Sequence, residues 1–559
     1  MSWRARLAAL LGGVQGTPGA IDLHGAPALV VRGSSGAPLP QLENPGSLIE
    51  LGAGGRAEAV VVDDLASVSL SDTLRAVRRG GRRFHLGVAP GATLEVNHRG
   101  ALALVGVQRA LRALAAVPGL SAAIESLAAL RIDLPAPSLE ATLEATRRAV
   151  SLVRPRPRRP GPPRVVHLTG RLGPGGAERQ LCYLAEAQRA AGSRVEVWTL
   201  TPIVGEDAHY LPDLTQAGVP ARAIAPHPRW RPAPPLPGID PELVALCERH
   251  AAAEALLPLA AALLADPPDV LHCWLDEPCT VGGLAGVLAG VPRVVLSTRN
   301  LNPTHIPRLM RPFFAGAYRE LAEAPAVRLV ANSQAGARDY AAWCGVDPGR
   351  FTVIPNGVPV AALGPLEGAE RAAARRALGY SPDAFLVAGV FRLAPMKRPG
   401  DFLDALETVR AEEPRLQAVH LGAGPLADSI EAEVRRRGLD WLRLLGRVRD
   451  PWAHLRLADA SLLPSVAEGC PNASLESQGL GVPIVLTDAA GSPETVAPGE
   501  TGFVVGVGDT AAMAARLLEL ARDPELRRRM GRAGRARIAS EYSLEAMVRR
   551  TAALYGGAA

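Results

Sequence analysis

Lysine is nearly absent from this chain of 559 residues: Lys397 is the only one, although lysine and arginine together number 61. Because arginine fills every other such position, an exposed lysine without a special task could equally have been arginine. An ammonium group is a compact point charge that the planar guanidinium fork does not reproduce. The single lysine is therefore a candidate functional residue.

Other scarcities exclude several classes of protein. No run of about 20 apolar residues is present to span a bilayer, and the start, MSWRARLAALLGGVQG, predicts a short amphipathic helix rather than a cleaved signal peptide. The six cysteines include no C-x-x-C pair, which argues against a zinc site or a disulfide framework and predicts a cytoplasmic protein. A net charge of +6 with scattered arginines gives no support for nucleic-acid binding.

Proline and arginine crowd the segment RPRPRRPGPPR (154–164), which predicts an extended linker at 151–163. Residues 1–150 hold the strand-like runs ALVVR, SLIEL and EAVVVDD and predict an accessory α/β domain of unknown role. There IELGAGG (49–55) suggests a dinucleotide- or methyl-donor-binding loop, but only four residues separate Gly55 from the strand expected at Val60. No helix fits that gap, so the helix N-terminus that such a loop needs would be missing.

After the linker, short apolar strands alternate with helix-length segments, which is typical of a parallel sheet covered by helices on both faces. One series predicts a domain at 164–360: RVVHLT, RVEVWTL, DVLHCWL, RVVLST, VRLVAN and FTVIPNGV. A second series predicts a domain at 384–540: AFLVAGVF, LQAVHLGAG, LRLLG, ASLLPS, PIVLTD and GFVV. Residues 361–383 would connect them. Ligands bind at the carboxyl ends of such strands, so two facing α/β domains would form a cleft between them.

Glycine loops and cations follow some of these strands. Gly175 and Gly176 precede a helix, where they would let a ligand approach the backbone and its free N–H groups. Arg392 and Lys397 follow the first strand of the second domain, and two fixed cations suit a departing diphosphate. A tight strand-to-helix turn and a solvated basic turn are the respective alternatives.

The segment EGCPNASLESQG (468–479) places two carboxylates around a predicted helix start. Pro471 suits the first turn, where its missing N–H costs nothing, so Glu468 would lie in the preceding loop and Glu476 inside the helix. Free N–H groups at a helix start attract anions. An acid/base pair is the first interpretation of two such glutamates.

In order and spacing, GGAERQL, VIPNGV, FRLAPMK, LGAGPL, LGRVRD, PSVAEGCPNASLESQGLGVPIVLTDAAGSPE and GFVV resemble the retaining glycosyltransferases of family 4, over about residues 164–559. The resemblance implies the GT-B fold, with two facing Rossmann-like domains and a terminal helix at 541–559 that returns to the first. It implies transfer from a UDP- or GDP-sugar to a hydroxyl of a sugar or lipid-linked acceptor, in the synthesis of cell-surface polysaccharide, lipopolysaccharide or glycolipid. The family is metal-independent, and no D-x-D motif occurs in the chain, so neither a metal nor a cofactor is expected.

The same resemblance assigns roles to individual residues. Glu468 would hold hydroxyls of the donor sugar, and Glu476 would bind the ribose diol. Arg392 and Lys397 would bind the diphosphate. Three backbone segments would complete the donor site: the amides of Asn472, Ala473 and Ser474, the loop of Gly175 and Gly176, and, near the nucleobase, the turn of Gly446, Arg447 and Val448.

One departure from the family concerns a histidine. Many members carry one beside the donor sugar, after a strand of the first domain, where this chain has Arg299 and Asn300. His272, at the end of the preceding predicted strand, is the nearest catalytic candidate, with a structural role as the alternative.

Two alternatives to a transferase stay open. One is a nucleotide-sugar-binding module without turnover, and the other is a different GT-B enzyme such as a sugar-nucleotide epimerase. The arginine-rich stretches and the amphipathic start could also touch the inner face of the membrane.

Overall fold

The computed structural model describes residues 138–226, 234–362 and 364–556 and, nearer the N-terminus, only four strands. These are β1 (Leu29–Val31), β2 (Ile49–Leu51), β3 (Arg83–Ala89) and β4 (Ala92–Asn97). β1 and β2 pair in parallel, which confirms strands in ALVVR and SLIEL, whereas β3 and β4 form an antiparallel pair that was not expected. The strand predicted at Val60 and the glycines of 52–55 lie outside the described residues.

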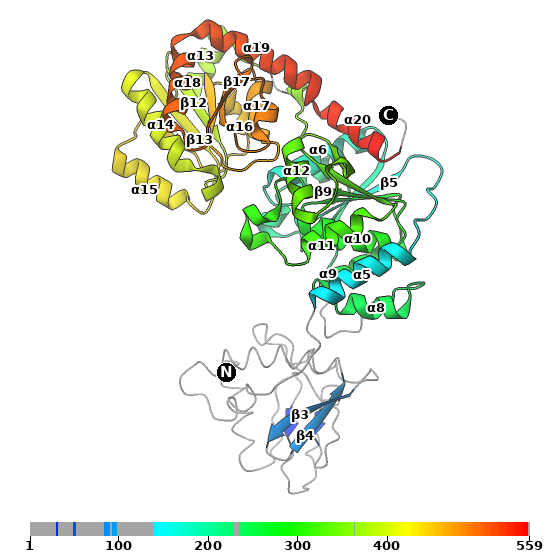
Figure 1. Cartoon of the computed structure of the whole chain (residues 1–559). Coiled ribbons are helices and arrows are strands. Elements are labelled where there is room, and N and C mark those ends of the chain that lie inside the picture. The colour runs from blue at the N-terminus through cyan, green and yellow to red at the C-terminus, as the bar shows by residue number, and fades with distance from the viewer. Residues whose placement is uncertain are drawn as a thin grey trace. The chain divides into compact units, whose positions relative to one another are not determined.

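Contacts divide the chain into two compact units, residues 1–142 with 226–258, and residues 143–225 with 259–559. The second unit contains both large sheets (Figure 1). Helix α5 (Leu139–Leu152), which precedes the predicted linker, contributes to this unit from Leu143 on. Leu143 packs against Gly316 of α11 (Phe314–Ala322), and Arg147 pairs with Glu320 at 3.0 Å.

The proline- and arginine-rich stretch is hydrogen-bonded to the same unit. The backbone N–H of Arg156 donates to the carbonyl oxygen of Gly290 at 2.8 Å, and the Arg158 guanidinium donates to that of Gly556 at 2.8 Å. Proline removes helical hydrogen bonds, but the remaining N–H groups and the arginine side chains find acceptors on neighbouring loops. The stretch therefore lies along this unit, and its role as a linker stays a prediction.

Seven parallel strands form the first sheet, in the order β11-β10-β9-β8-β5-β6-β7. They are β5 (Arg164–Thr169), β6 (Arg194–Thr199), β7 (Ala221–Ala223), β8 (Val270–Trp274), β9 (Arg293–Ser297), β10 (Val327–Ala331) and β11 (Phe351–Val353). The six predicted strands are confirmed; the edge strand β7 escapes prediction because its three residues carry no apolar pattern. The helices between the strands are α6 (Gly176–Ala190), α7 (Leu211–Gln216), α8 (Pro241–Glu248), α9 (Ala253–Ala265), α10 (Asp276–Leu288), α11 and α12 (Gln334–Cys344).

Helix α10 approaches one face of this sheet closely. A Cβ atom at Gly282 would come within 2.4 Å of Leu168, and one at Gly286 within 2.9 Å of Val294. Glycine at these positions therefore lets the helix lie directly on the strands, which brings the backbone at the ends of β8 and β9 into a fixed position.

Six parallel strands form the second sheet, in the order β14-β13-β12-β15-β16-β17. They are β12 (Phe385–Val390), β13 (Leu416–Leu421), β14 (Leu442–Leu444), β15 (Ala460–Leu463), β16 (Ile484–Thr487) and β17 (Gly502–Val505), all in predicted segments. The helices are α13 (Gly368–Ala377), α14 (Pro399–Glu412), α15 (Ala427–Arg437), α16 (Pro451–Leu455), α17 (Asn472–Gly479), α18 (Thr510–Arg522) and α19 (Pro524–Glu541).

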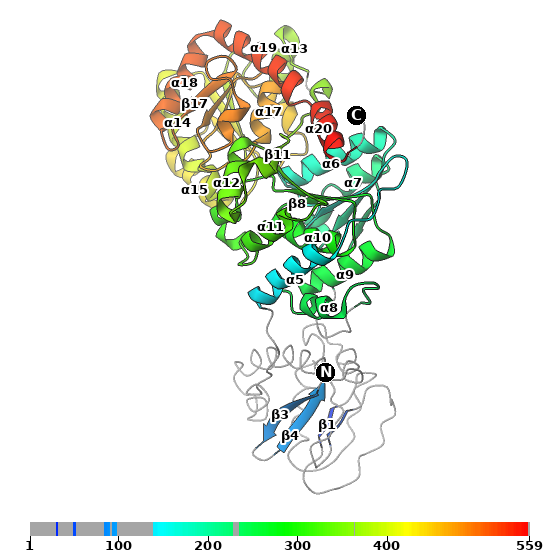
Figure 2. The same ribbon diagram turned by 45° about the vertical axis from the view of Figure 1, so that its right-hand side comes forward.

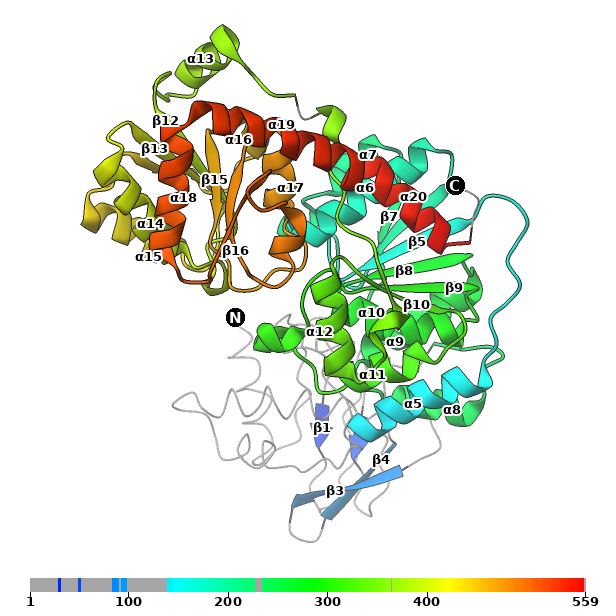
Figure 3. The ribbon, with the colours of Figure 1, turned by 45° about the horizontal axis from the view of Figure 1, so that its top comes forward.

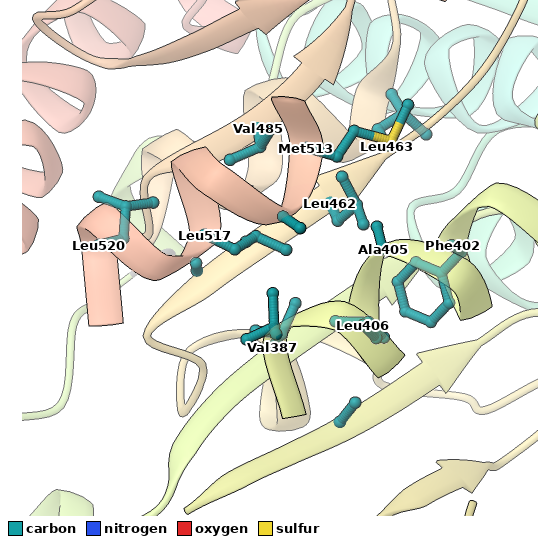
Figure 4. Close-up of a cluster of buried hydrophobic side chains, with 14 of the residues drawn as sticks. Val387, Phe402, Ala405, Leu406, Leu462, Leu463, Val485, Met513, Leu517 and Leu520 are labelled. Carbon is teal, nitrogen blue, oxygen red and sulfur yellow. The ribbon is translucent and has the colours of Figure 1, made fainter. Parts of the chain in front are cut away.

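Both faces of the second sheet are buried, as expected for nearly continuous apolar strands. On one face Val387 and Leu462 pack with Phe402 of α14 and Leu517 of α18 (Figure 4). On the other face a separate cluster includes Leu475 of α17. The strands of this sheet thus hold α17 firmly from its buried side.

The last two helices run from the second sheet to the first (Figures 2 and 3). Ile538 of α19 belongs to the core that contains Leu475, whereas Met547 of α20 (Leu544–Leu554) belongs to the core of the first sheet, with Leu181 of α6. Among the described residues, no helix combines the length and the apolar character needed to cross a membrane.

Candidate functional site

Helix α17 begins where the sequence predicts it, immediately after Pro471. The backbone N–H groups of Asn472 and Ala473 have no hydrogen-bond acceptor within the described part of the chain, while that of Ser474 donates to the carbonyl oxygen of Pro471 at 3.1 Å. Two of the three predicted amides are therefore open to an anion, and the third is used by the helix itself.

Glu468 and the single lysine form an ion pair. Lys397, in the turn after β12, contacts Oε1 of Glu468, which also accepts a hydrogen bond from Oγ of Ser465 at 2.7 Å. The carbonyl oxygen of Glu468 accepts from the N–H of Gly491 at 3.0 Å. All these bonds fix the loop before α17, and both side-chain bonds use Oε1, which leaves Oε2 for a ligand.

Arg392, the second predicted cation, follows the same strand as Lys397. Its side chain is exposed and has no partner among the residues that the structure describes. The strand β12 thus ends in one cation that is already paired and one that is free to meet an anion.

The second glutamate of the motif, Glu476, is completely buried. Arg179 of α6 approaches it, with 2.5 Å between Nη2 and Oε1. Burial raises the pKa of the Glu476 carboxyl, and the charge of Arg179 opposes that rise. Neither carboxylate oxygen accepts a hydrogen bond from the described residues, so this carboxylate lacks the partners that buried polar groups normally have.

The glycine loop before α6 lies against the start of α17. The Asn472 side chain donates from Nδ2 to the carbonyl oxygen of Gly176 at 3.2 Å. A Cβ atom at Gly175 would overlap the Glu178 carboxylate at 1.9 Å, and one at Gly176 would press on Asn472 at 3.0 Å. The predicted loop and the predicted helix start are therefore brought together, and glycine is what permits the approach.

A hydrogen-bonded network that sequence reasoning missed joins the two sheets behind this point. Asn356 donates from Nδ2 to the carbonyl oxygen of Cys470 at 2.7 Å and to Oδ1 of Asn472 at 2.6 Å. Gln180 of α6 exchanges two hydrogen bonds with the backbone of Gly357, at 2.8 and 2.9 Å. The segments GGAERQL and VIPNGV contain these residues, but nothing in the residue types indicates that the two amide side chains meet α17.

Arg299 stands behind Asn356. Its guanidinium donates to Oδ1 of Asn356 and to the carbonyl oxygen of Ile354 at 3.3 Å, and it lies 4.9 Å from the ring of Trp274. Burial lowers the pKa of Arg299 to about 10. This arginine, at the position where the family often has histidine, supports the network and has no carboxylate partner among the described residues.

His272 makes no hydrogen bond with this group in the described structure, and its catalytic role stays a prediction. It lies within β8 rather than at its end, and its Nδ1 is 2.7 Å from the hydroxyl of Tyr555, just past α20. Its ring stacks on Trp274 at 4.6 Å, and burial holds its pKa well below the usual range. Tyr555 thus occupies one ring nitrogen, while Nε2 is buried without a hydrogen-bond partner among the described residues.

The turn predicted near the nucleobase follows β14. Gly446 has φ +61° and its carbonyl oxygen accepts from the N–H of Gly422 at 2.7 Å. Arg447 pairs with Glu206 at 3.3 Å, both exposed, and Val448 packs against the core on the α17 side of the sheet. Contact of this turn with a nucleobase stays a prediction.

Taken together, the site offers an anion a pair of free amides, a free arginine and a lysine. Two carboxylates lie beside them. Glu468 uses only Oε1 for its side-chain contacts, and Glu476 is buried without hydrogen bonds. Such a set can neutralise a phosphate and hold hydroxyl groups, because carboxylates accept and cannot donate.

Two family profiles match the chain over these elements. The profile described as Glycosyl transferases group 1 matches residues 370–537, and that described as Glycosyltransferase Family 4 matches residues 174–362. The first match contains Arg392, Lys397 and both glutamates, and the second contains the glycine loop.

Several named proteins are similar in sequence. The Vi polysaccharide biosynthesis protein VipC/TviE of Salmonella typhi is 29% identical, over 61% of this chain and 62% of that protein. A D-inositol 3-phosphate glycosyltransferase of Geodermatophilus obscurus is 35% identical, over 42% of this chain and 54% of that protein. A GDP-mannose-dependent monoacylated alpha-(1-6)-phosphatidylinositol monomannoside mannosyltransferase of Corynebacterium glutamicum is 30% identical, over 50% and 74%. The chain thus spans less than two thirds of the first two relatives.

Among solved structures, HepE of Anabaena in complex with UDP and glucose superposes with a TM-score of 0.58. The two share 21% sequence identity over 71% of this chain and 100% of that chain. At this identity the likeness concerns the fold.

Proposed function

Because this chain belongs to the glycosyltransferases of family 4, we propose that it is a retaining enzyme that moves a sugar from a UDP- or GDP-sugar to a hydroxyl group of an acceptor. The GT-B fold expected from the sequence is confirmed by the two parallel sheets and by the likeness to HepE. The observation that carries the proposal is the grouping of Lys397, Glu468 and Glu476 around the start of α17, with the start of α6 hydrogen-bonded to it.

Different residues would bind different parts of the donor. The open amides of Asn472 and Ala473, with Arg392 and Lys397, would bind the diphosphate and stabilise the charge that it gains as it leaves. Glu476 would accept from the ribose diol, and the free Oε2 of Glu468 would accept from hydroxyls of the sugar. The turn at 446–448 would face the base.

Cleavage of the sugar–phosphate bond leaves an electron-poor, oxocarbenium-like sugar, and the acceptor hydroxyl would attack from the face that the diphosphate leaves. No protein nucleophile takes part in this scheme. The fixed cations on the diphosphate take the role that a metal has in other transferases, so we propose that the reaction needs neither a metal nor a cofactor.

For the acceptor we propose a sugar or lipid-linked intermediate in cell-surface polysaccharide, lipopolysaccharide or glycolipid synthesis. The support is that the similar proteins include one named for Vi polysaccharide biosynthesis and one named as a phosphatidylinositol mannoside mannosyltransferase. Such an acceptor would place the reaction in the cytoplasm, with peripheral contact at the inner face of the membrane.

The test starts with thermal shifts against UDP, GDP, ADP and TDP, followed by the sugar forms of whichever nucleotide stabilises the chain. Incubation with that donor and with membrane or oligosaccharide fractions should release nucleoside diphosphate and label an acceptor, with and without EDTA alike. Binding without release would favour the non-catalytic module, and release of an altered sugar without an acceptor would favour an epimerase.

A further inference from the structure

Among the described residues, Arg179 is the charged residue of the first sheet's domain that contacts the buried carboxylate of Glu476. It lies one turn into α6, whose first residue, Gly176, contacts Asn472 at the start of α17. Glu476 lies four residues after Asn472, about 6 Å along the helix axis. Arg179 therefore reaches across from one helix start to the carboxylate beside the other.

Both helix starts carry unused N–H groups. Gly176 and Ala177 of α6, like Asn472 and Ala473 of α17, have no backbone acceptor within the described ranges. The positive ends of two helix dipoles thus lie beside Arg179, and the buried carboxylate of Glu178 is at the start of α6. A second positive group in such a place is unfavourable unless an anion joins it, and Glu476 is the only anion that Arg179 contacts in the described residues.

The pair formed by Arg179 and Glu476 is incomplete. The two nearest atoms are 2.5 Å apart, but the geometry is not that of a hydrogen bond. Nε of Arg179 and both oxygens of Glu476 are buried without hydrogen-bond partners. The indole Nε1 of Trp452 is also buried without a partner, and it lies near enough to Glu476 to lower the pKa of that carboxyl. A buried ion pair is stable only when hydrogen bonds satisfy its remaining donors and acceptors. Unsatisfied donors and acceptors around one contact point to a polar ligand that would supply partners for both.

We propose that Arg179 is a donor-binding residue that neutralises Glu476 in the empty site and binds the nucleotide diphosphate in the loaded one. This inference rests on the proposed function, since it requires a nucleoside diphosphate as ligand. The ribose diol has two O–H donors for the two Glu476 oxygens, and the diphosphate has the anionic acceptors that Arg179 lacks. The guanidinium fork suits phosphate oxygens, which it can meet with two parallel N–H groups.

This change of partners by Arg179 and Glu476 determines which ligand the site prefers. While Arg179 pairs with Glu476, the arginine blocks access of a ribose to the carboxylate. A nucleoside must displace Arg179, and because it has no phosphates it offers the arginine no new partner. A nucleoside diphosphate satisfies both residues at once. Arg179 therefore makes the site select for the diphosphate rather than for the base and ribose alone.

The experiment compares the affinities of a nucleoside and its diphosphate, uridine with UDP or guanosine with GDP, for the full chain by calorimetry. Arg179→Ala should weaken binding of the diphosphate about 10- to 100-fold, the size expected for hydrogen bonds to charged groups. Binding of the nucleoside should stay the same or tighten. Arg189→Ala, an exposed arginine on the same helix, is the matched control and should change neither value.

A second variant removes the concern that Arg179→Ala leaves an unpaired buried carboxylate. In the Glu476→Gln background the charge is gone, and adding Arg179→Met should still reduce the preference for diphosphate over nucleoside. An equal loss for both ligands, or an unchanged ratio, would overturn the inference and leave the proposed function standing. Failure of the unaltered chain to bind any of these diphosphates would overturn both.

Discussion

The two sheets of the second unit contribute to the site in different ways. The second sheet supplies charges that its own loops hold in place, such as Lys397 paired with Glu468. The first sheet's domain supplies mainly neutral hydrogen bonds, from Gln180 and Asn356. The arginines that it contributes here are Arg179, which contacts Glu476, and Arg299, which supports Asn356 from behind. The second sheet's domain thus holds most of the site's charges on its own loops, and the first sheet's domain contacts the start of α17.

The largest effect should follow loss of the lysine from the charged half. Lys397→Ala should lower kcat by on the order of 10²-fold, because it removes a fixed cation from the departing diphosphate. Steady-state kinetics with the identified donor measures the effect. Arg398→Ala is a matched control. The guanidinium of Arg398, next to Lys397 in sequence, is paired with Asp401, so its loss should leave kcat unchanged. Unchanged kinetics for Lys397→Ala would contradict the role given to the charged half.

Substitutions of the two glutamates in the second sheet's domain should have different effects on donor binding. Glu476→Ala should weaken binding of the plain nucleoside diphosphate about 30-fold, as expected when hydrogen bonds to a charged group are lost. Glu468→Ala should leave that affinity nearly unchanged and weaken only the extra affinity that the sugar gives. Calorimetry with the diphosphate and with the nucleotide-sugar makes the distinction. Equal losses of plain nucleotide affinity would show that the division of labour is wrong.

Acid should destabilise both halves through buried histidines. Burial lowers the pKa of His420 in the second sheet and of His167 in the first to about 4. The unfolded chain takes up the proton near the ordinary value of 6.5 and the folded chain only near 4, so stability falls as the pH drops through that window. Each histidine should cost about 2 kcal/mol between about pH 7.5 and about pH 5.

His420 offers the clean probe of this effect. Its ring nitrogens have no hydrogen-bond partners in the described structure and its ring packs on Phe391 and Phe402, whereas His167 is bonded to Gln188 and Trp274. His420→Leu should therefore reduce the acid-induced loss measured by urea unfolding at the two pH values. If the loss is as large as in the unaltered chain, the second sheet is not acid-sensitive at this residue.

The smallest effect on stability should follow a substitution beside the first sheet. Tyr555→Phe removes the hydroxyl that contacts His272 and should reduce the free energy of unfolding by about 1 kcal/mol, with kcat unchanged. Thermal unfolding and steady-state kinetics check the two parts. A strong loss of turnover without a loss of stability would favour the catalytic role predicted for His272.

Much of the fold follows from local patterns. Apolar segments such as RVVHLT and AFLVAGV become buried strands because each lies between helices on both faces, and Pro471 marks the start of α17 as predicted. Lys397 and Glu468, on loops after two strands of one sheet, also meet, because parallel strands bring their carboxyl ends to one edge. The short edge strand β7 and the antiparallel pair β3 and β4 carry weaker patterns and were not foreseen.

Other assignments depend on contacts between distant segments. His272 has the same neighbours in sequence whether it faces a ligand or a helix, and it is Tyr555, 283 residues later, that occupies its ring nitrogen. The role proposed for Arg179 likewise depends on its contact with Glu476, which lies on α17 beside the other sheet.

For this protein the sequence alone determined the alternation of strands and helices, the unique lysine, and the two glutamates that bracket a helix start, since these are properties of contiguous residues. Only the tertiary structure decided which charges pair, which carboxylate is buried without hydrogen bonds, and which histidine is covered. The physical reason is that burial and ion pairing depend on the distance between side chains from separate elements. That distance is set by how the helices pack, and no local pattern records it.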